Sequence, residues 1–261
     1  RLVNADTQIK QTPFDFKQGG RFSFSPDGKR VALSRPDSIS LANYDGTGLV
    51  SNVITFPQVI TYSEYQYHPV PIWAADSASL RVAVPPEDPM AEPAQLTNLW
   101  SIPASGSSPV LLSKIPAIGF AWPKNAFSPD LNQVAYIKQV GEPAENLREL
   151  HIAKPDGSGD RVFLQAVSLE FYNWSPDSLH FTYRIVNGTS AGFYLGNSEN
   201  DGAQITSSIE IIWMGWLDEN RYLYTQKAGD FWELRLGNIV SGIYDLVDKF
   251  STATIVYDSS K

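Results

Sequence analysis

Histidine is the residue type in this chain best suited to bind a transition metal, and the sequence has three, His68, His151 and His180. A histidine metal site needs several ligands that converge on one centre. The three histidines belong to three different copies of a repeat described below, so their side chains should not meet. We therefore expect no metal site and no cofactor in this chain.

The stretch KPDGSGD, residues 154–160, has oxygen-bearing side chains at the alternate spacing of a calcium-binding loop, on Asp156, Ser158 and Asp160. A complete loop of that kind needs an acidic residue at its twelfth position. Val167 stands there. The sequence therefore predicts a hairpin turn and not a calcium site.

Nucleophilic catalysis would need a serine or cysteine in a suitable setting. A serine nucleophile on a strand-to-helix turn carries the pattern G-x-S-x-G, which does not occur in the sequence. The chain also has no cysteine, which excludes disulfides, thiolate metal ligands and a cysteine nucleophile. We expect no catalytic residues and no enzymatic activity within this chain.

Aromatic side chains are the stronger candidates, and their chemistry is that of binding a partner. The segment ITYSEYQYHPVPIW, residues 60–73, contains Tyr65, Tyr67 and His68, and the later segment GFAWPKN contains Trp122. Tyrosine and tryptophan combine a large contact area with a polar tip, as anchors of protein interfaces do. We expect Tyr65 and Tyr67 to be more exposed than Tyr62 of the same segment. The alternative is that these rings pack between the first two repeats.

Two cations could add a binding site for an anionic group. Arg21 and Lys124 each stand six residues before the aspartate that marks a repeat. If the repeats are in register, both lie near the mouth of a central channel. The alternative is that they are solvated or form salt bridges to Glu170 or Glu210.

A repeat of about 40 to 50 residues must position these candidates. Similar turns contain an aspartate at spacings of 40 to 54 residues, at Asp27, Asp76, Asp130, Asp177, Asp218 and Asp258. Such a period is typical of propeller blades. Large side chains lie four and six residues after the first five aspartates, which is the period of a strand with one buried face. These are Val31, Leu33, Leu80, Val82, Val134, Tyr136, Phe181, Tyr183, Tyr222 and Tyr224.

Each repeat therefore begins with a strand, a tight Asp turn and a second strand. We expect the large residues at these positions, and the aromatic residues three before the aspartates, to form the core between blades. The latter are Phe24, Trp73, Phe127 and Trp174.

A second hairpin follows in each repeat, with a turn rich in Gly, Asp and Asn such as NYDGTG or KPDGSGD. Four strands per repeat predict an all-β fold, a β-propeller of four-stranded antiparallel blades in one domain over residues 1–261. The start, RLVNADTQIKQTPF, resembles a second hairpin, and the end, STATIVYDSSK, resembles a first strand with its turn. We expect the two ends to close a sixth blade; a five-bladed ring is the alternative.

The composition limits the class of partner. The 261 residues carry a net charge of −8, which disfavours nucleic acid and an anionic membrane surface as partners. No apolar run approaches the roughly 20 residues of a membrane span, so we expect no membrane insertion. The chain opens at Arg1, from which we expect a processed product or a fragment.

The repeats resemble those of the TolB-type, Pro-Asp-repeat β-propellers of bacteria. FSPDGKRVAL, FSPDLNQVAYI and WSPDSLHFTY carry the resemblance, whereas the copies WAADSASLRVAV and GWLDENRYLYT lack the Ser-Pro pair. The resemblance covers nearly the whole chain. It implies a bacterial, extracytoplasmic (periplasmic or cell-surface) protein that binds proteins or peptides, and we expect a monomer. Similar propellers of the oligogalacturonate lyase type depend on a histidine-rich metal centre, which three scattered histidines do not match.

The loops indicate where a partner would bind. Two long, acidic, proline-containing stretches, residues 85–97 and 138–149, should lie on the face opposite the Asp turns, as should residues 60–73. Long loops on a rigid scaffold commonly carry binding residues. The sequence therefore predicts a non-catalytic module that recognises a protein or peptide through this face. The alternative is the propeller domain of a larger peptidase or glycan-active enzyme, which would filter its substrate.

Overall fold

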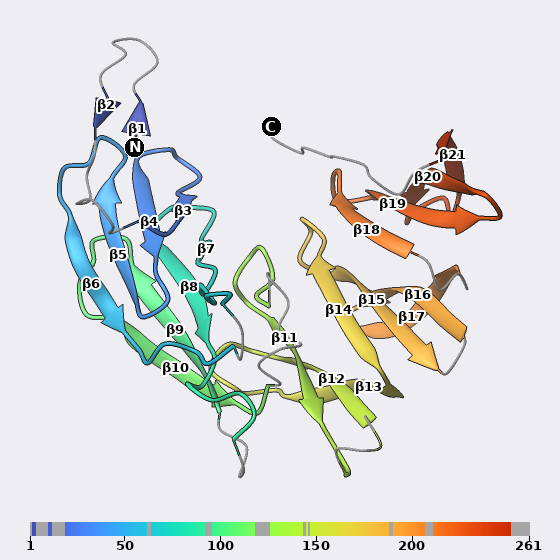
Figure 1. Ribbon diagram of the computed structural model, residues 1–261, viewed down its shortest axis with the longest axis horizontal. Helices are drawn as coiled ribbons and strands as arrows, with labels where there is room; N and C mark the ends of the chain where they lie inside the picture. Colours follow the sequence, from blue (N-terminus) through green and yellow to red (C-terminus); the bar gives the residue numbers. More distant parts are fainter. Residues whose placement is uncertain are drawn as a thin grey trace. The chain divides into compact units, whose positions relative to one another are not determined.

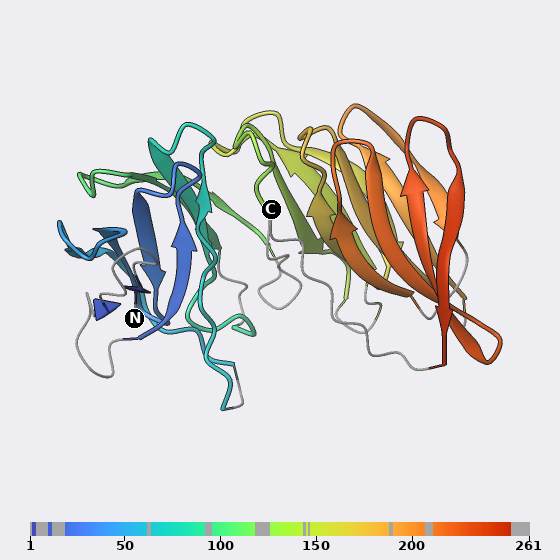
Figure 2. The same cartoon turned by 90° about the horizontal axis from the view of Figure 1, so that it is seen from above.

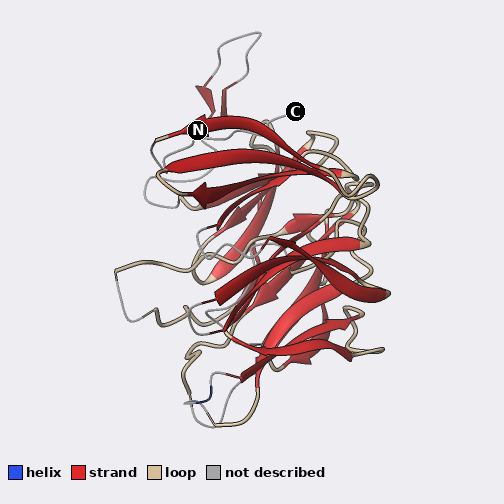
Figure 3. Cartoon of the chain, turned by 90° about the vertical axis from the view of Figure 1, so that its right-hand side faces the viewer, coloured by secondary structure: helices blue, strands red, loops and turns tan. Residues whose placement is uncertain are grey.

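β-strands make up almost all of the secondary structure, as the all-β prediction requires (Figures 1 and 3). The computed structural model describes residues 2–3, 10–11, 19–61, 64–91, 96–117, 126–142, 145, 147–187, 190–206 and 211–251. In that part of the chain the strands form four four-stranded sheets, one three-stranded sheet and one two-stranded sheet. Strands follow their order in the sequence within every sheet, so each sheet is a meander.

The strands have the following bounds. The two-stranded sheet consists of β1 (Leu2–Val3) and β2 (Lys10–Gln11). The first four-stranded sheet consists of β3 (Arg21–Phe24), β4 (Arg30–Ser34), β5 (Ser38–Asn43) and β6 (Val50–Thr55). The second consists of β7 (Ile72–Trp73), β8 (Ser79–Val84), β9 (Thr97–Pro103) and β10 (Val110–Ile115).

The later sheets have these bounds. The three-stranded sheet consists of β11 (Val134–Gln139), β12 (Leu147–Ala153) and β13 (Arg161–Val167). The next sheet consists of β14 (Leu169–Trp174), β15 (His180–Asn187), β16 (Ser190–Asn197) and β17 (Asn200–Thr206). The last consists of β18 (Ile211–Trp216), β19 (Arg221–Ala228), β20 (Phe231–Asn238) and β21 (Tyr244–Phe250).

The predicted pair of hairpins is confirmed in four of the five repeats. In these four, the Asp turn precedes the second strand of the sheet and the Gly-rich turn joins the third strand to the fourth. In the third repeat, residues 118–125 lie outside the described residues, and the described part before the Asp turn forms a bridge at Phe127, where the N–H of Ala135 donates to the carbonyl of Ala126 at 2.8 Å. The described part of this repeat therefore has a sheet of three strands, where we predicted four.

The predicted core positions are also confirmed, with one exception. All ten residues four and six places after the aspartates are at most 3 % exposed. Three places before the aspartates, Trp73, Phe127 and Trp174 are buried, but Phe24 is 53 % exposed. Phe24 lies in the first four-stranded sheet, so in the described part of the chain no earlier sheet of that kind covers it.

Two tryptophans bind consecutive sheets together by the same contact. The indole N–H of Trp73 donates to the carbonyl of Ser23 at 3.1 Å, and that of Trp174 donates to the carbonyl of Ala126 at 3.0 Å. Both donors stand three residues before a repeat aspartate, and both acceptors stand four residues before the previous one. The repeat is therefore visible in tertiary contacts as well as in the sequence.

The chain divides into two compact units. The first comprises Arg1–Trp122, Asp130–Val134 and Ala153–Asp160, and the second comprises Pro123–Pro129, Ala135–Ile152 and Arg161–Lys261. In the first unit, a cluster that includes Ile39, Leu41, Leu80 and Val82 joins sheet β3–β6 to sheet β7–β10. In the second, Phe193 packs with Tyr222 and Tyr224 and joins sheet β14–β17 to sheet β18–β21. These two sheets lie side by side (Figure 2, yellow to red).

The start of the chain can be compared with the predicted ring closure, whereas the end cannot. β1 and β2 pair antiparallel, with Leu2 opposite Gln11, as expected for a hairpin at the start. Residues 252–261, predicted to supply the complementary strand, lie outside the described residues. Closure into a ring, the number of blades and a single domain over residues 1–261 stay predictions.

Candidate partner-binding site

Residues 56–71 connect β6 to β7 and are called the linker (Figure 1). The hydroxyl of Ser34 donates to the carbonyl of Pro69 at 2.5 Å, and that of Ser23 donates to the carbonyl of Pro71 at 3.4 Å. The N–H of Ile60 donates to the carbonyl of Glu87 at 2.7 Å, in the loop between β8 and β9. The linker is therefore fixed to the first sheet and touches one of the two long loops predicted to share its face.

Arg21 and Tyr65 meet although 44 residues separate them. Nη2 of Arg21 donates to the Tyr65 hydroxyl at 3.1 Å. Arg21 opens β3, and Tyr65 lies in the linker with 55 % of its surface exposed. The hydroxyl of Thr61 donates to the carbonyl of Tyr65 and so helps to hold the residue in place. The pair presents a cation and an aromatic ring to solvent.

Tyr67 is partly buried, and Tyr62, with which we compared its exposure, lies outside the described residues. Burial raises the pKa of its phenol to about 12; the neighbouring Tyr65 also raises it, and Arg21 lowers it. The phenol therefore stays protonated at any physiological pH and carries no negative charge. Tyr67 also lies within the electrostatic field of both Tyr65 and Arg21, so the three side chains form one cluster, which we call the Arg21 cluster.

His68 makes a local contact. Its Nδ1 lies 3.1 Å from the carbonyl of Gln66, and because a carbonyl only accepts, Nδ1 carries the proton. This bond orients the ring within the linker. Trp122 and Lys124, the other two predicted binding residues, lie outside the described residues.

Glu170, one of the two suggested salt-bridge partners of Arg21, lies in the second unit and pairs there with Arg184 at 3.3 Å, so a salt bridge to Arg21 stays an untested alternative. Glu210 lies outside the described residues. Sequence reasoning singled out Arg21 and Tyr65 separately but did not predict their contact. The available signal was that the start of a first strand and the linker both belong to the face opposite the Asp turns.

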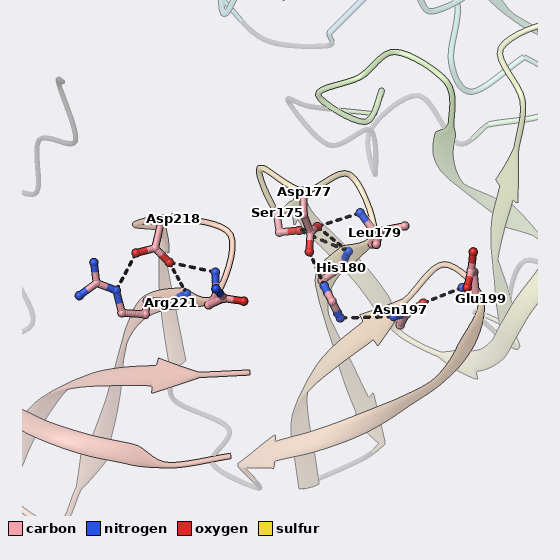
Figure 4. Close-up of polar contacts among 9 residues, drawn as sticks. Ser175, Asp177, Leu179, His180, Asn197, Glu199, Asp218 and Arg221 are labelled. Atoms are coloured by element: carbon pink, nitrogen blue, oxygen red, sulfur yellow. Dashed lines mark hydrogen bonds and ion pairs between the residues drawn. The ribbon is translucent and has the colours of Figure 1, made fainter. Parts of the chain in front are cut away.

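A second polar cluster surrounds the Asp turn of the fourth repeat and contains serine, aspartate and histidine (Figure 4). The hydroxyl of Ser175 and the N–H groups of Leu179 and His180 donate to Oδ1 of Asp177. Nδ1 of His180 lies 2.6 Å from Oδ2 of Asp177, and Nδ2 of Asn197 lies 3.3 Å from Nε2 of His180. Both ring nitrogens therefore have partners other than Ser175.

This arrangement stabilises a turn and lacks the geometry of a catalytic triad. A triad needs the serine hydroxyl to bond to the histidine ring, whereas Ser175 bonds to the carboxylate. Burial acts to raise the pKa of Asp177, but hydrogen bonds from Ser175 and His180 outweigh it and lower the pKa. Asp218 closes the next turn in the same way, with bonds from the N–H groups of Asn220 and Arg221 (Figure 4).

The three histidines occupy separate settings. His151 is buried in β12, stacked on Tyr136 and 3.1 Å from Oε2 of Glu149. His68 and His180 likewise contact residues close to them in sequence, so each of the three imidazole rings has its own local partner. Among the described residues, no three His, Asp or Glu side chains gather as a group that could hold a metal ion. In the same part of the chain, no helix has the length and hydropathy needed to cross a bilayer.

Comparison with known proteins shows similarity in structure only. The sequence matches no protein-family model and no curated protein. Oligogalacturonate lyase from Vibrio parahaemolyticus is 13 % identical, with a TM-score of 0.61 over 98 % of this chain and 73 % of that one. Dipeptidyl peptidase 4 from Porphyromonas gingivalis is 11 % identical, with a TM-score of 0.55 over 94 % of this chain and 43 % of that one.

TolB from Acinetobacter baumannii is 14 % identical, with a TM-score of 0.50 over 84 % of this chain and 53 % of that one. This chain therefore spans about half the length of that TolB. At such low identity the likeness concerns the fold alone. Together with the repeated four-stranded sheets, it shows that the chain has a TolB-like β-propeller fold.

Proposed function

We propose that this chain is a non-catalytic binding module that recognises a protein or peptide through the linker and the long loops beside it. One observation carries the proposal: the linker is fixed to its sheet yet presents an exposed tyrosine next to an exposed arginine. Side chains of this kind on a rigid support are typical anchors of protein interfaces. The cluster at Asp177 supports the non-catalytic part, because the Ser175 hydroxyl donates to the carboxylate of Asp177 and not to the imidazole ring of His180.

We further propose that the protein acts as a monomer outside the cytoplasm, on the basis of its resemblance to TolB-type propellers. Its net charge of −8 disfavours nucleic acid as the partner. The second candidate function is that of a propeller domain that filters substrate for a larger peptidase or glycan-active enzyme. The likeness to a dipeptidyl peptidase and to an oligogalacturonate lyase supports it. A domain with G-x-S-x-G encoded in the same gene would favour this second function.

The binding proposal can be tested with a library of random dodecamer peptides displayed on phage and selected on the whole chain. Replacing Tyr65, Tyr67 and Trp122 together with alanine should abolish binding of the selected peptides. Tyr65→Ala alone should weaken it at least 10-fold, because an exposed aromatic anchor contributes about 2 kcal/mol. Affinity is measured by fluorescence polarisation with synthetic copies of the peptides.

Phe231→Ala is the matched control, since Phe231 is an aromatic residue of similar exposure, 52 %, that lies in the other unit. It should leave affinity unchanged. The single Tyr65→Ala variant removes an exposed side chain only, so a loss of binding there does not reflect unfolding. Equal affinity of the wild type and both linker variants would refute the assignment of the face.

A further inference from the structure

Arg21 is an exposed cation whose partner is a phenol in place of a carboxylate. Among the described residues no carboxylate forms an ion pair with it. A guanidinium offers five N–H donors in a planar fork, so the bond to Tyr65 engages only part of it. That bond fixes one edge of the guanidinium and leaves the rest of the fork available to a ligand.

Tyr67 adds a neutral phenol beside this cation. Its pKa of about 12 keeps the phenol protonated, so it adds no negative charge near Arg21. An anion that approaches Arg21 therefore meets the guanidinium without repulsion from this phenol. The whole chain is acidic, with a net charge of −8, so a local site for an anion contrasts with the rest of the molecule.

The number of charges favours a carboxylate over a phosphate. Arg21 is the cation whose charge lowers the pKa of Tyr67. One planar fork matches the two coplanar oxygens and the single charge of a carboxylate, which it can bind through two parallel hydrogen bonds. A phosphate dianion would call for more positive charge than one arginine supplies.

We propose that Arg21, oriented by Tyr65 and flanked by Tyr67, binds a carboxylate of the partner peptide. The carboxylate is either the free C-terminus or an aspartate or glutamate side chain. This inference rests on the proposed function, because it names the chemical group recognised at the same face.

The experiment uses matched synthetic arrays of random dodecamers. One array has free C-terminal carboxylates and the other has C-terminal amides. Within each array, every position is occupied in turn by Asp or Glu and, in a matched peptide, by the neutral Asn or Gln. The whole chain should prefer peptides with a carboxylate at one defined place. A preference lost in the C-terminal amides identifies the C-terminus, and one lost with Asn or Gln identifies a side chain.

Arg21→Gln should weaken binding of the carboxylate peptides about 10- to 100-fold, and leave their neutral analogues within about 2-fold, because a charge-assisted bidentate pair is lost. Arg21→Lys, which keeps the charge without the fork, should fall between. Lys29→Gln is the control: it removes an exposed positive charge from the other end of the β3–β4 hairpin and should change neither set.

The outcomes separate the two proposals. Peptides that bind with no carboxylate preference, or with equal affinity to wild type and Arg21→Gln, would overturn the carboxylate inference and leave the binding face intact. If no peptide on either array binds, both proposals fail.

Discussion

Replacing Trp174 with alanine should lower the free energy of unfolding by about 4 kcal/mol, as is usual for a large aromatic side chain removed from a core. Trp174 is buried, and its ring centroid lies 5.2 Å from that of Phe181 and 6.0 Å from that of Phe171. Its indole N–H also reaches the carbonyl of Ala126 in the preceding repeat. The substitution would therefore open a cavity where two consecutive repeats meet.

Trp174→Phe separates packing from hydrogen bonding. It keeps most of the ring, and the carbonyl of Ala126 keeps its bond from the N–H of Ala135, so the loss should be only about 1 kcal/mol. Urea unfolding followed by far-UV circular dichroism measures both variants. A loss below 1 kcal/mol for Trp174→Ala would show that the contact between repeats does not stabilise the fold.

Gly196→Ala should cost about 2 to 3 kcal/mol although it adds a single methyl group. Gly196 lies directly opposite Phe181 in the β15–β16 pair, and a Cβ at this position would come within 2.3 Å of the Phe181 ring. Phe181 is fully buried, and its ring contacts those of Phe163, Phe171 and Trp174, so it has little room to move. Overpacking of this kind typically costs 1 to 3 kcal/mol.

Two further variants test that explanation by thermal unfolding. Gly19→Ala is the matched control, because a Cβ there would meet nothing within 4 Å, and its effect should stay within about 0.5 kcal/mol. Combining Gly196→Ala with Phe181→Leu should cost less than the sum of the two single changes, since the smaller side chain relieves the clash. Strict additivity would contradict a direct contact.

Much of the fold could be predicted from the sequence because the same pattern occurs in five copies of the repeat. The Asp turns and the alternation of large residues after them are local signals, and the ten positions that they mark are buried. The pairing of Gly196 with Phe181 was not predictable in this way. It depends on which residues of two strands face each other, and a glycine within a strand does not reveal its partner.

The structure deviates from the repeat at positions where the local sequence does not reveal which other strands or sheets lie next to a residue. Phe24 has the residue type and position of a core aromatic, yet it is exposed, because burial depends on what covers the sheet. The first strand of the third repeat has the expected Phe-Ser-Pro-Asp pattern, yet its described residues form a bridge at Phe127 and not a longer strand.

The candidate site was predictable only in its parts. Residue type and loop position singled out Tyr65 and Tyr67, and the spacing to Asp27 singled out Arg21. Their grouping follows from the path of the linker, which hydrogen bonds from Ser23 and Ser34 hold against the first sheet.

The central claim is that a partner binds the linker face. Its most direct test is hydrogen–deuterium exchange of the whole chain, measured with and without a selected dodecamer that binds tightly. We predict slower exchange of backbone amides in residues 56–71 and 85–91, and unchanged exchange at the Asp turns of residues 25–29 and 175–179. Slower exchange at the Asp turns with no change in the linker would contradict the account.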